Sequence, residues 1–248
     1  MAGAGAGPLT LLASGPVIPN FGQGSSCVRG DHTFCWDWVR SHWSDTLAPA
    51  LVQHLELVAI AIGIGFVIAF ALALFTHRAR SFDQPIGVFS ALLYTIPSLA
   101  LFQLLVPFSG ITWTTVEVAL VAYTLVILYP NISAGLRSPP PDVIEAARGM
   151  GLTPRQVLWR VELPLAVPAI IAGLRIAVVS TISIATIAAF LLPKGLGYPI
   201  FVALGAPTPF KTEIYSAGAL AIGLALVCDT LLLLLRRILV PWARLRVA

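Results

Sequence analysis

Residues 57–76 read LVAIAIGIGFVIAFALALFT, a run of 20 residues without a charged side chain. An α-helix rises about 1.5 Å per residue, so this run covers the roughly 30 Å hydrocarbon core of a bilayer. It therefore predicts a membrane-spanning helix. The whole chain of 248 residues is 58% hydrophobic and 10% charged, whereas soluble proteins carry roughly 25% charged residues. This composition excludes a soluble enzyme, a nucleic-acid binder or a disordered scaffold as a description of the whole chain.

Four more segments are apolar over a length that can span a membrane. They lie at residues 86–105, 118–136, 168–192 and 214–239, and a turn at 107–110 is expected after the first of them. We therefore expect an all-α integral membrane protein with five spans. Its organisation is expected to be an extracytoplasmic segment at 1–46, a membrane domain at 47–240 and a cytoplasmic tail at 241–248. A cleaved signal peptide is not expected, because residues 1–7 carry no basic side chain.

The basic residues between the spans predict the orientation, because cytoplasmic loops keep the excess of Lys and Arg. One set of segments holds Arg78, Arg80, Arg137, Arg148, Arg155, Arg160, Arg236, Arg237, Arg244 and Arg246, and the other holds Arg29, Arg40, Lys194 and Lys211. The first set is therefore expected in the cytoplasm, with the C-terminus, and the N-terminus is expected outside. This distribution explains the net charge of +4 without a nucleic-acid partner.

The segment 137–165 joins two spans on the side expected to face the cytoplasm. Three prolines at 139–141 are expected to end the preceding helix. Asp142 then suits the N-cap of a short helix, with Glu145 three residues later in capping-box spacing. Gly151 allows a sharp turn after this helix.

A second short helix is expected in the same segment. Thr153 suits its N-cap and Pro154 its first position, and Leu163 and Pro164 are expected to end it. The two helices would form a compact knob on the cytoplasmic surface, held by spans on both sides.

The residues of this knob carry a family pattern. Glu145, Ala146 and Ala147 are followed by three residues, Gly151, nine residues, Val161, one residue, Leu163 and Pro164. The segment resembles the EAA loop of permease subunits of binding-protein-dependent ATP-binding-cassette importers, in which isoleucine is usual at the position of Val161. The resemblance implies a five-span type I permease fold whose EAA helix docks into a cleft of a cytoplasmic ATPase. The implied docking residues are Glu145, Ala146, Ala147, Gly151, Leu163 and Pro164. An ordinary amphipathic loop is the alternative.

A finer resemblance, over about residues 55–204, is to permeases of importers for quaternary-ammonium osmolytes such as glycine betaine, choline and carnitine. It is carried by the segments at 94–101, 145–152, 161–166, 172–175, 185–190 and 195–197. Where that subfamily has small residues before Gly195, this chain has Leu191, Leu192, Pro193 and Lys194, which places a charge at the outer mouth. The solute is left open between such an osmolyte and an amino acid or another small solute.

A permease of this kind needs an energy source, and the chain has no P-loop. The nearest match, at 205–212, has Phe210 where the second glycine is required. We therefore expect no enzymatic activity and no cofactor in this chain, with ATP held by a partner ATPase dimer. The resemblance also implies a second permease subunit, identical or paralogous, and an extracytoplasmic solute-binding protein. An ATP-independent secondary transporter or channel is the alternative class, but no inverted repeat is evident.

Polar residues within spans are candidates for a solute pathway. The chosen candidates are Tyr94, Pro97, Ser98, Arg175 and Ser183. For Arg175 and for Asp229 the alternative is a structural charge pair or a snorkelling side chain, and the Ser183 hydroxyl could bond to its own helix. Pro97 frees a backbone carbonyl at membrane depth, which is tolerated mainly beside a cavity.

Aromatic and cysteine residues are expected at the outer side. Trp36, Trp38, Trp43, Tyr198, Phe201, Phe210 and Tyr215 could form an interfacial belt or a cage for a quaternary ammonium ion. Cys27 and Cys35 could form a disulfide in an oxidising compartment. With Cys228, they are too few for a metal site.

Overall fold

The structure is a computed structural model that describes residues 34–206 and 210–241, and within these ranges it is helical. Its helices are α2 (Trp36–Ser41), α3 (Ala48–Arg78), α4 (Asp83–Thr95), α5 (Ser98–Ser109), α6 (Trp113–Arg137), α7 (Pro141–Gly149), α8 (Pro154–Val157), α9 (Leu163–Ile187), α10 (Gly197–Gly205) and α11 (Lys211–Leu239). Short 3-10 or π-helical turns precede α3 and α4, join α8 to α9 and follow α9. The all-α prediction is confirmed.

Four continuous helical segments are long and apolar enough to cross a membrane. They are Trp43–Arg78, Trp113–Arg137, Pro154–Phe190 and Lys211–Leu239. A fifth crossing is available when the pair Arg80–Thr95 and Ser98–Ser109 counts as one span, although the two helices are bent by 100°. The described residues therefore hold four continuous candidate spans, and the predicted count of five is reached when the bent pair is one broken span.

The prediction of a single helix over 86–105 was wrong at Pro97. Proline has no N–H group and forces the preceding residue away from helical geometry. Ile96 accordingly has φ −75° and ψ 123°, between α4 and α5. The carbonyl of Ile96 accepts a hydrogen bond from the Tyr123 hydroxyl of α6. The predicted turn at 107–110 was also misplaced, because Pro107 lies inside α5 and the chain turns at Gly110, with φ 71°.

The helix that leads into the fourth span is longer than predicted. Leu163 and Pro164 were expected to end a helix, but α8 runs through the π-helical turn Leu158–Glu162 into α9. The Leu163 N–H donates to the Leu158 carbonyl, five residues back. The hydrogen-bond register of the helix is therefore already shifted at the position of Pro164. The missing N–H of proline is therefore tolerated without a break.

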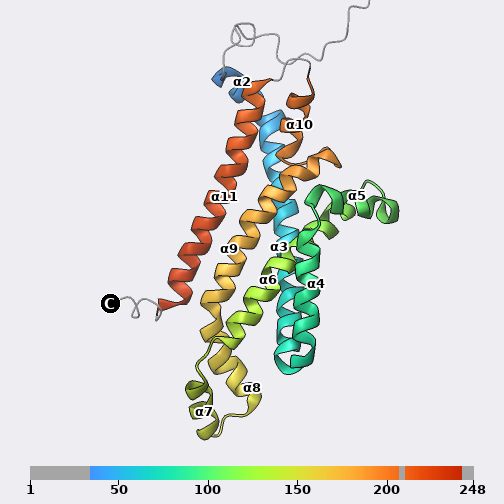
Figure 1. The fold of residues 1–248 in the computed structure, drawn as a ribbon. Helices are drawn as coiled ribbons and strands as arrows, with labels where there is room; N and C mark the ends of the chain where they lie inside the picture. Colours follow the sequence, from blue (N-terminus) through green and yellow to red (C-terminus); the bar gives the residue numbers. More distant parts are fainter. Residues whose placement is uncertain (1–33, 207–209, 242–248) are drawn as a thin grey trace, which may run out of the picture.

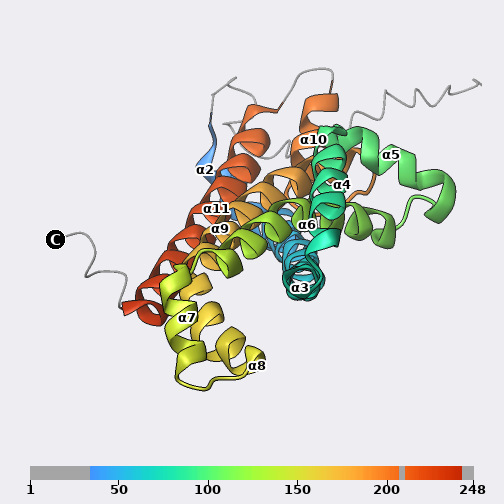
Figure 2. The same cartoon turned by 60° about the horizontal axis from the view of Figure 1, so that its bottom comes forward.

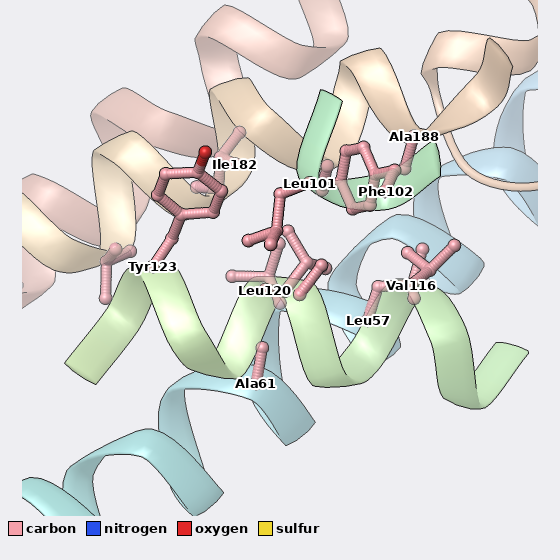
Figure 3. Packing of buried hydrophobic residues seen from close by; sticks show 13 residues of the cluster. Leu57, Ala61, Leu101, Phe102, Val116, Leu120, Tyr123, Ile182 and Ala188 are labelled. Carbon is pink, nitrogen blue, oxygen red and sulfur yellow. The ribbon is translucent and has the colours of Figure 1, made fainter. Parts of the chain in front are cut away.

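The bundle is centred on α6, which packs against α3 on one side and α9 on the other (Figure 1). Small residues allow these close crossings. A Cβ atom on Gly65 would lie 2.5 Å from Thr124, and one on Gly173 would lie 2.5 Å from Asn131. Figure 3 shows the core that results, where side chains of α3, α5, α6 and α9 meet. They include Leu57, Phe102, Leu120 and Ile182.

Helix α11 has a different environment. It packs along α9 and α10, but in its most apolar stretch no residue is fully buried within this chain. Large apolar side chains such as Ile222, Leu226 and Ile238 are therefore free to contact lipid or another subunit.

The aromatic residues expected at the outer side lie on α2, α10, the first turns of α11 and the nearby turns, at the end of the bundle opposite α7 (Figure 1). Trp36 is 67% exposed, as a belt requires, but Trp38 is buried between His42 and Phe210. Cys35 is buried and disulfide-bonded, which agrees with the predicted bridge. Cys27 lies outside the described residues, as do the segments 1–33 and 242–248 on which part of the domain prediction falls.

Candidate coupling loop and translocation groove

Helix α7 begins two residues earlier than predicted. Its N-cap is Pro140, without a side-chain cap, and Asp142 lies in the first turn. The prediction that Asp142 caps this helix through a capping box was therefore wrong, because Pro141 already has the φ angle of a first helical residue. The carboxylate of Asp142 still favours this end of the helix dipole.

The end of α7 explains the spacing between Ala147 and Gly151. Gly151 has φ 83°, in the left-handed region that favours glycine. Its N–H donates to the Arg148 carbonyl at 2.9 Å, and the Leu152 N–H donates to the Ala147 carbonyl at 3.3 Å. These two bonds form a Schellman motif, which ends a helix and reverses the chain. A glycine four residues after Ala147 is thus what this turn requires.

The second helix of the knob begins as predicted at Thr153. The Gln156 N–H donates to the Thr153 hydroxyl at 3.4 Å, and the Thr153 N–H donates to the Gln156 side-chain oxygen at 2.8 Å. This reciprocal pair is a capping box. Because α8 continues into α9, the knob and the fourth span share one helical shaft, Pro154–Phe190.

The predicted docking residues divide between the surface and the shaft. Figure 2 shows α7 and α8 projecting together from the bundle. Glu145, Ala146 and Gly151 are exposed on this knob, whereas Ala147 is 2% exposed and packs inside it. Leu163 and Pro164 are half-buried in the shaft below.

Sequence reasoning missed the apolar part of the knob surface. Met150 is 74% exposed, and Val143 and Trp159 are also exposed. Met150 lies between two glycines at the end of α7. This position at the chain reversal was the sequence signal that could have predicted its exposure.

Polar contacts tie the base of the knob to α3 and α4. The Asp83 carboxylate, at the start of α4, accepts hydrogen bonds from Tyr129 (2.9 Å), Ser133 (3.1 Å) and Arg137 (2.7 Å) of α6. The Tyr129 hydroxyl also contacts the Thr76 hydroxyl of α3 at 3.2 Å.

A second contact joins the knob to α3. His77 of α3 lies 2.8 Å from Glu162 in the shaft. A cleft of about 840 Å³ separates the knob from these helix ends, and His77, Arg78, Arg137, Glu145, Arg148 and Glu162 are among its lining residues.

The second candidate site is a groove between α9 and α11. Its volume is about 970 Å³, and Arg175, Ser183 and Asp229 line it together with mainly apolar side chains. The Arg175 guanidinium donates through Nε (2.7 Å) and Nη2 (2.9 Å) to the two Asp229 carboxylate oxygens. Arg175 and Asp229 therefore form a bidentate ion pair, and both residues line the groove. Ser183 donates to the Val179 carbonyl of its own helix at 3.1 Å.

The other pathway candidates lie elsewhere. Tyr94, Pro97 and Ser98 belong to the bend between α4 and α5, and none of them lines the α9–α11 groove. Tyr94 is exposed, and Pro97 and Ser98 begin α5. The structure therefore separates the five candidates into two groups.

A bundle of apolar spans with a helical knob at one end is the arrangement that the sequence resemblance to importer permeases predicts. Residues 61–245 match the family described as binding-protein-dependent transport system inner membrane component, and the chain belongs to this family.

Relatives and solved structures agree with this assignment. The osmoprotectant import permease protein OsmW of Salmonella typhimurium is 39% identical over 201 residues, covering 79% of this chain and 92% of that protein. The choline transport system permease protein OpuBB of Bacillus subtilis is 32% identical over 191 residues, covering 76% and 86%. Among solved structures, an inward-facing MetNI methionine ABC transporter has a TM-score of 0.70 at 19% identity, covering 81% of this chain and 98% of that chain. This likeness shows that the fold is that of an importer permease.

Proposed function

We propose that this chain is the permease subunit of an ATP-driven importer for a small quaternary-ammonium osmolyte, of the glycine betaine, choline or carnitine class. The observation that carries the proposal is the 39% identity to an osmoprotectant import permease over 79% of the chain. A permease for amino acids or another small solute is the alternative within the same family. A secondary transporter that works without ATP is the alternative from another class.

The proposed assembly contains two permease subunits, a cytoplasmic ATPase dimer and an extracytoplasmic binding protein. The open groove between α9 and α11 and the exposed apolar face of α11 support a second permease, because five spans of one chain do not enclose a path. ATP is held and hydrolysed by the partner ATPase in this proposal.

The proposed coupling proceeds through the knob. Glu145 and Ala146 enter a cleft of the ATPase, and closure of the ATPase dimer moves the two knobs of the assembly toward each other. The shaft Pro154–Phe190 transmits this movement to the fourth span without a break. The contacts of Asp83 and His77 carry it to α4 and α3.

Uptake by the reconstituted importer tests the solute class. Vesicles that contain the permease, its ATPase and its binding protein are expected to accumulate labelled choline or glycine betaine when ATP is enclosed. Vesicles without the ATPase are expected to accumulate none. Accumulation without the ATPase would contradict the importer mechanism, and accumulation of an amino acid in place of both osmolytes would favour the alternative solute.

The orientation is a separate prediction from the charge distribution. A cysteine introduced at Gly3 is expected to react with an impermeant thiol reagent in intact cells, and one at Val247 is not, in a background in which the native cysteines are replaced. Both positions lie outside the described residues. Reaction of both or of neither would show that an even number of spans separates the termini.

A further inference from the structure

The ammonium group of Lys194 lies on an aromatic ring at the end of the bundle opposite the knob. Its nitrogen is 4.6 Å from the centre of the Trp113 ring. Aromatic faces attract cations through their negative electrostatic face, most strongly in tryptophan. The ammonium has three N–H donors, but no hydrogen bond or ion pair of this group is found in residues 34–206 and 210–241. A quaternary ammonium has no such donors, so an aromatic face suits it better than it suits lysine.

The backbone that carries Lys194 is fixed to α3. The Gly195 N–H donates to the Gln53 side-chain oxygen at 3.2 Å, and the Leu196 N–H donates to Nδ1 of His54 at 3.3 Å. The proton of His54 is therefore on Nε2, which donates to the Ile182 carbonyl at 3.1 Å. The loop is thus built into the bundle, and the long side chain of Lys194 is its movable part.

A carboxylate without a partner lies one helical turn beyond the ring. Glu117 follows Trp113 by four residues on α6, so the two side chains share a face of the helix. Glu117 is 7% exposed, and neither of its carboxylate oxygens has a hydrogen-bond partner among the residues that the structure describes. Buried carboxyl groups are ordinarily paired, hydrogen-bonded or neutral, so a cation beside Glu117 would stabilise the charged form of this group.

We propose that Trp113 and Glu117 form a subsite for the quaternary ammonium group of the solute, and that Lys194 occupies its aromatic part in this structure. This inference rests on the proposed function for the class of solute. Arrival of the solute cation displaces the lysine ammonium into water, where it is strongly hydrated. The incoming cation takes the ring face and lies beside the Glu117 carboxylate. Lys194 thereby acts as a competitor tethered to the site.

Direct binding of choline tests the subsite. The permease–ATPase complex is placed in lipid nanodiscs without the binding protein, and bound labelled choline is measured by equilibrium dialysis. Lys194→Met removes the competing cation and is expected to tighten choline binding by about 2- to 30-fold, the range that a cation–π contact contributes. Lys194→Arg keeps a cation and is expected to bind choline as the parent does.

Variants of the ring and the carboxylate complete the test. In the Lys194→Met background, Trp113→Leu and Glu117→Gln are each expected to reverse the gain, and Trp113→Phe to retain part of it. The uncharged analogue 3,3-dimethylbutan-1-ol, which has the shape of choline, is expected to bind all variants alike. Choline binding that is insensitive to Trp113 overturns the subsite, and so does an equal effect on the uncharged analogue.

Uptake by the unmodified importer separates this inference from the proposed function. If the importer takes up choline or betaine but choline binding does not depend on Trp113, the subsite is contradicted and the proposed function is not. If the importer takes up neither choline nor betaine but choline binding still depends on Trp113, the proposed solute class is contradicted and the cation subsite is supported.

Discussion

Replacement of Glu145 by lysine is expected to reduce ATP-driven uptake by about 10- to 100-fold, the effect of losing a charge-assisted hydrogen bond across a docked interface. Glu145 is exposed on the knob and makes no side-chain hydrogen bond with the described part of this chain. Its carboxylate is therefore available to a partner. Solute-stimulated ATP hydrolysis by the reconstituted complex should fall with uptake.

Gly151→Val is expected to act on the same step through the backbone. No atom lies within 4 Å of a Cβ placed on Gly151, so the substitution causes no clash. The left-handed conformation with φ 83° costs an ordinary L-residue about 1–2 kcal/mol, and a β-branched residue more. The valine should therefore distort the end of α7 and misplace the docking surface.

Gly149→Ala is the matched control for this substitution. Gly149 is the last residue of α7, its φ is not positive, and a Cβ there would also meet no atom within 4 Å. Uptake by Gly149→Ala should equal that of the parent. Gly151→Asn should lie between the two, because asparagine tolerates this conformation better than valine does.

Insertion into the membrane and solute affinity of the binding protein should be unchanged in these variants, because Glu145 and Gly151 lie outside the candidate spans. They are measured by the amount of subunit in washed membranes and by titration of the isolated binding protein. Normal uptake by both Glu145→Lys and Gly151→Val would contradict the proposed coupling through the knob.

The knob was predictable from sequence because its signals are local. The N-cap at Thr153 and the chain reversal at Gly151 depend on residues within one turn of each other, and both occur where expected. Spans were predictable for a similar reason, since apolar length alone identifies them. The two wrong predictions in this segment each concern one helix boundary. Asp142 was expected to be the N-cap of α7, but Pro141 already begins that helix. Leu163 and Pro164 were expected to end a helix, but the π-helical turn Leu158–Glu162 continues it into α9.

Pro97 and Pro164 show why the remaining geometry was not predictable. Pro97 breaks a helix by 100°, whereas Pro164 is carried within a continuous helix. The difference lies in the surroundings of each proline. The Tyr123 hydroxyl of another helix satisfies the carbonyl beside Pro97, and the preceding π-helical turn accommodates Pro164. The first of these contacts joins residues 27 positions apart in the chain, which no local pattern reveals.

The ion pair between α9 and α11 is a contact of the same long-range kind. Arg175 and Asp229 are 54 positions apart, and each side chain is 28% exposed in the isolated chain. Sequence reasoning selected Arg175 for a pathway and weighed a structural pair beside it. The bidentate geometry satisfies both charges at a depth where a lone charge is strongly unfavourable.

Removal of either partner is therefore expected to destabilise the subunit. Arg175→Leu and Asp229→Leu should each lower the amount of folded subunit in the membrane several-fold, since an unpaired charge then remains in a medium of low dielectric constant. The double variant Arg175→Leu and Asp229→Leu should recover most of this loss, because leucine pairs suit the apolar groove. Detergent extraction followed by fluorescence-detected size exclusion measures the folded fraction.

Uptake by the double variant then distinguishes a structural pair from a pathway. Ser183→Ala is the matched control in the same groove, since its hydroxyl bonds to its own helix and should be dispensable for folding. If the pair only joins α9 to α11, the double variant should fold and also transport. Recovery of folding without recovery of uptake would show that solute or conformational change requires the charges themselves. Equal folding of the single and double variants would contradict a stabilising role for the pair.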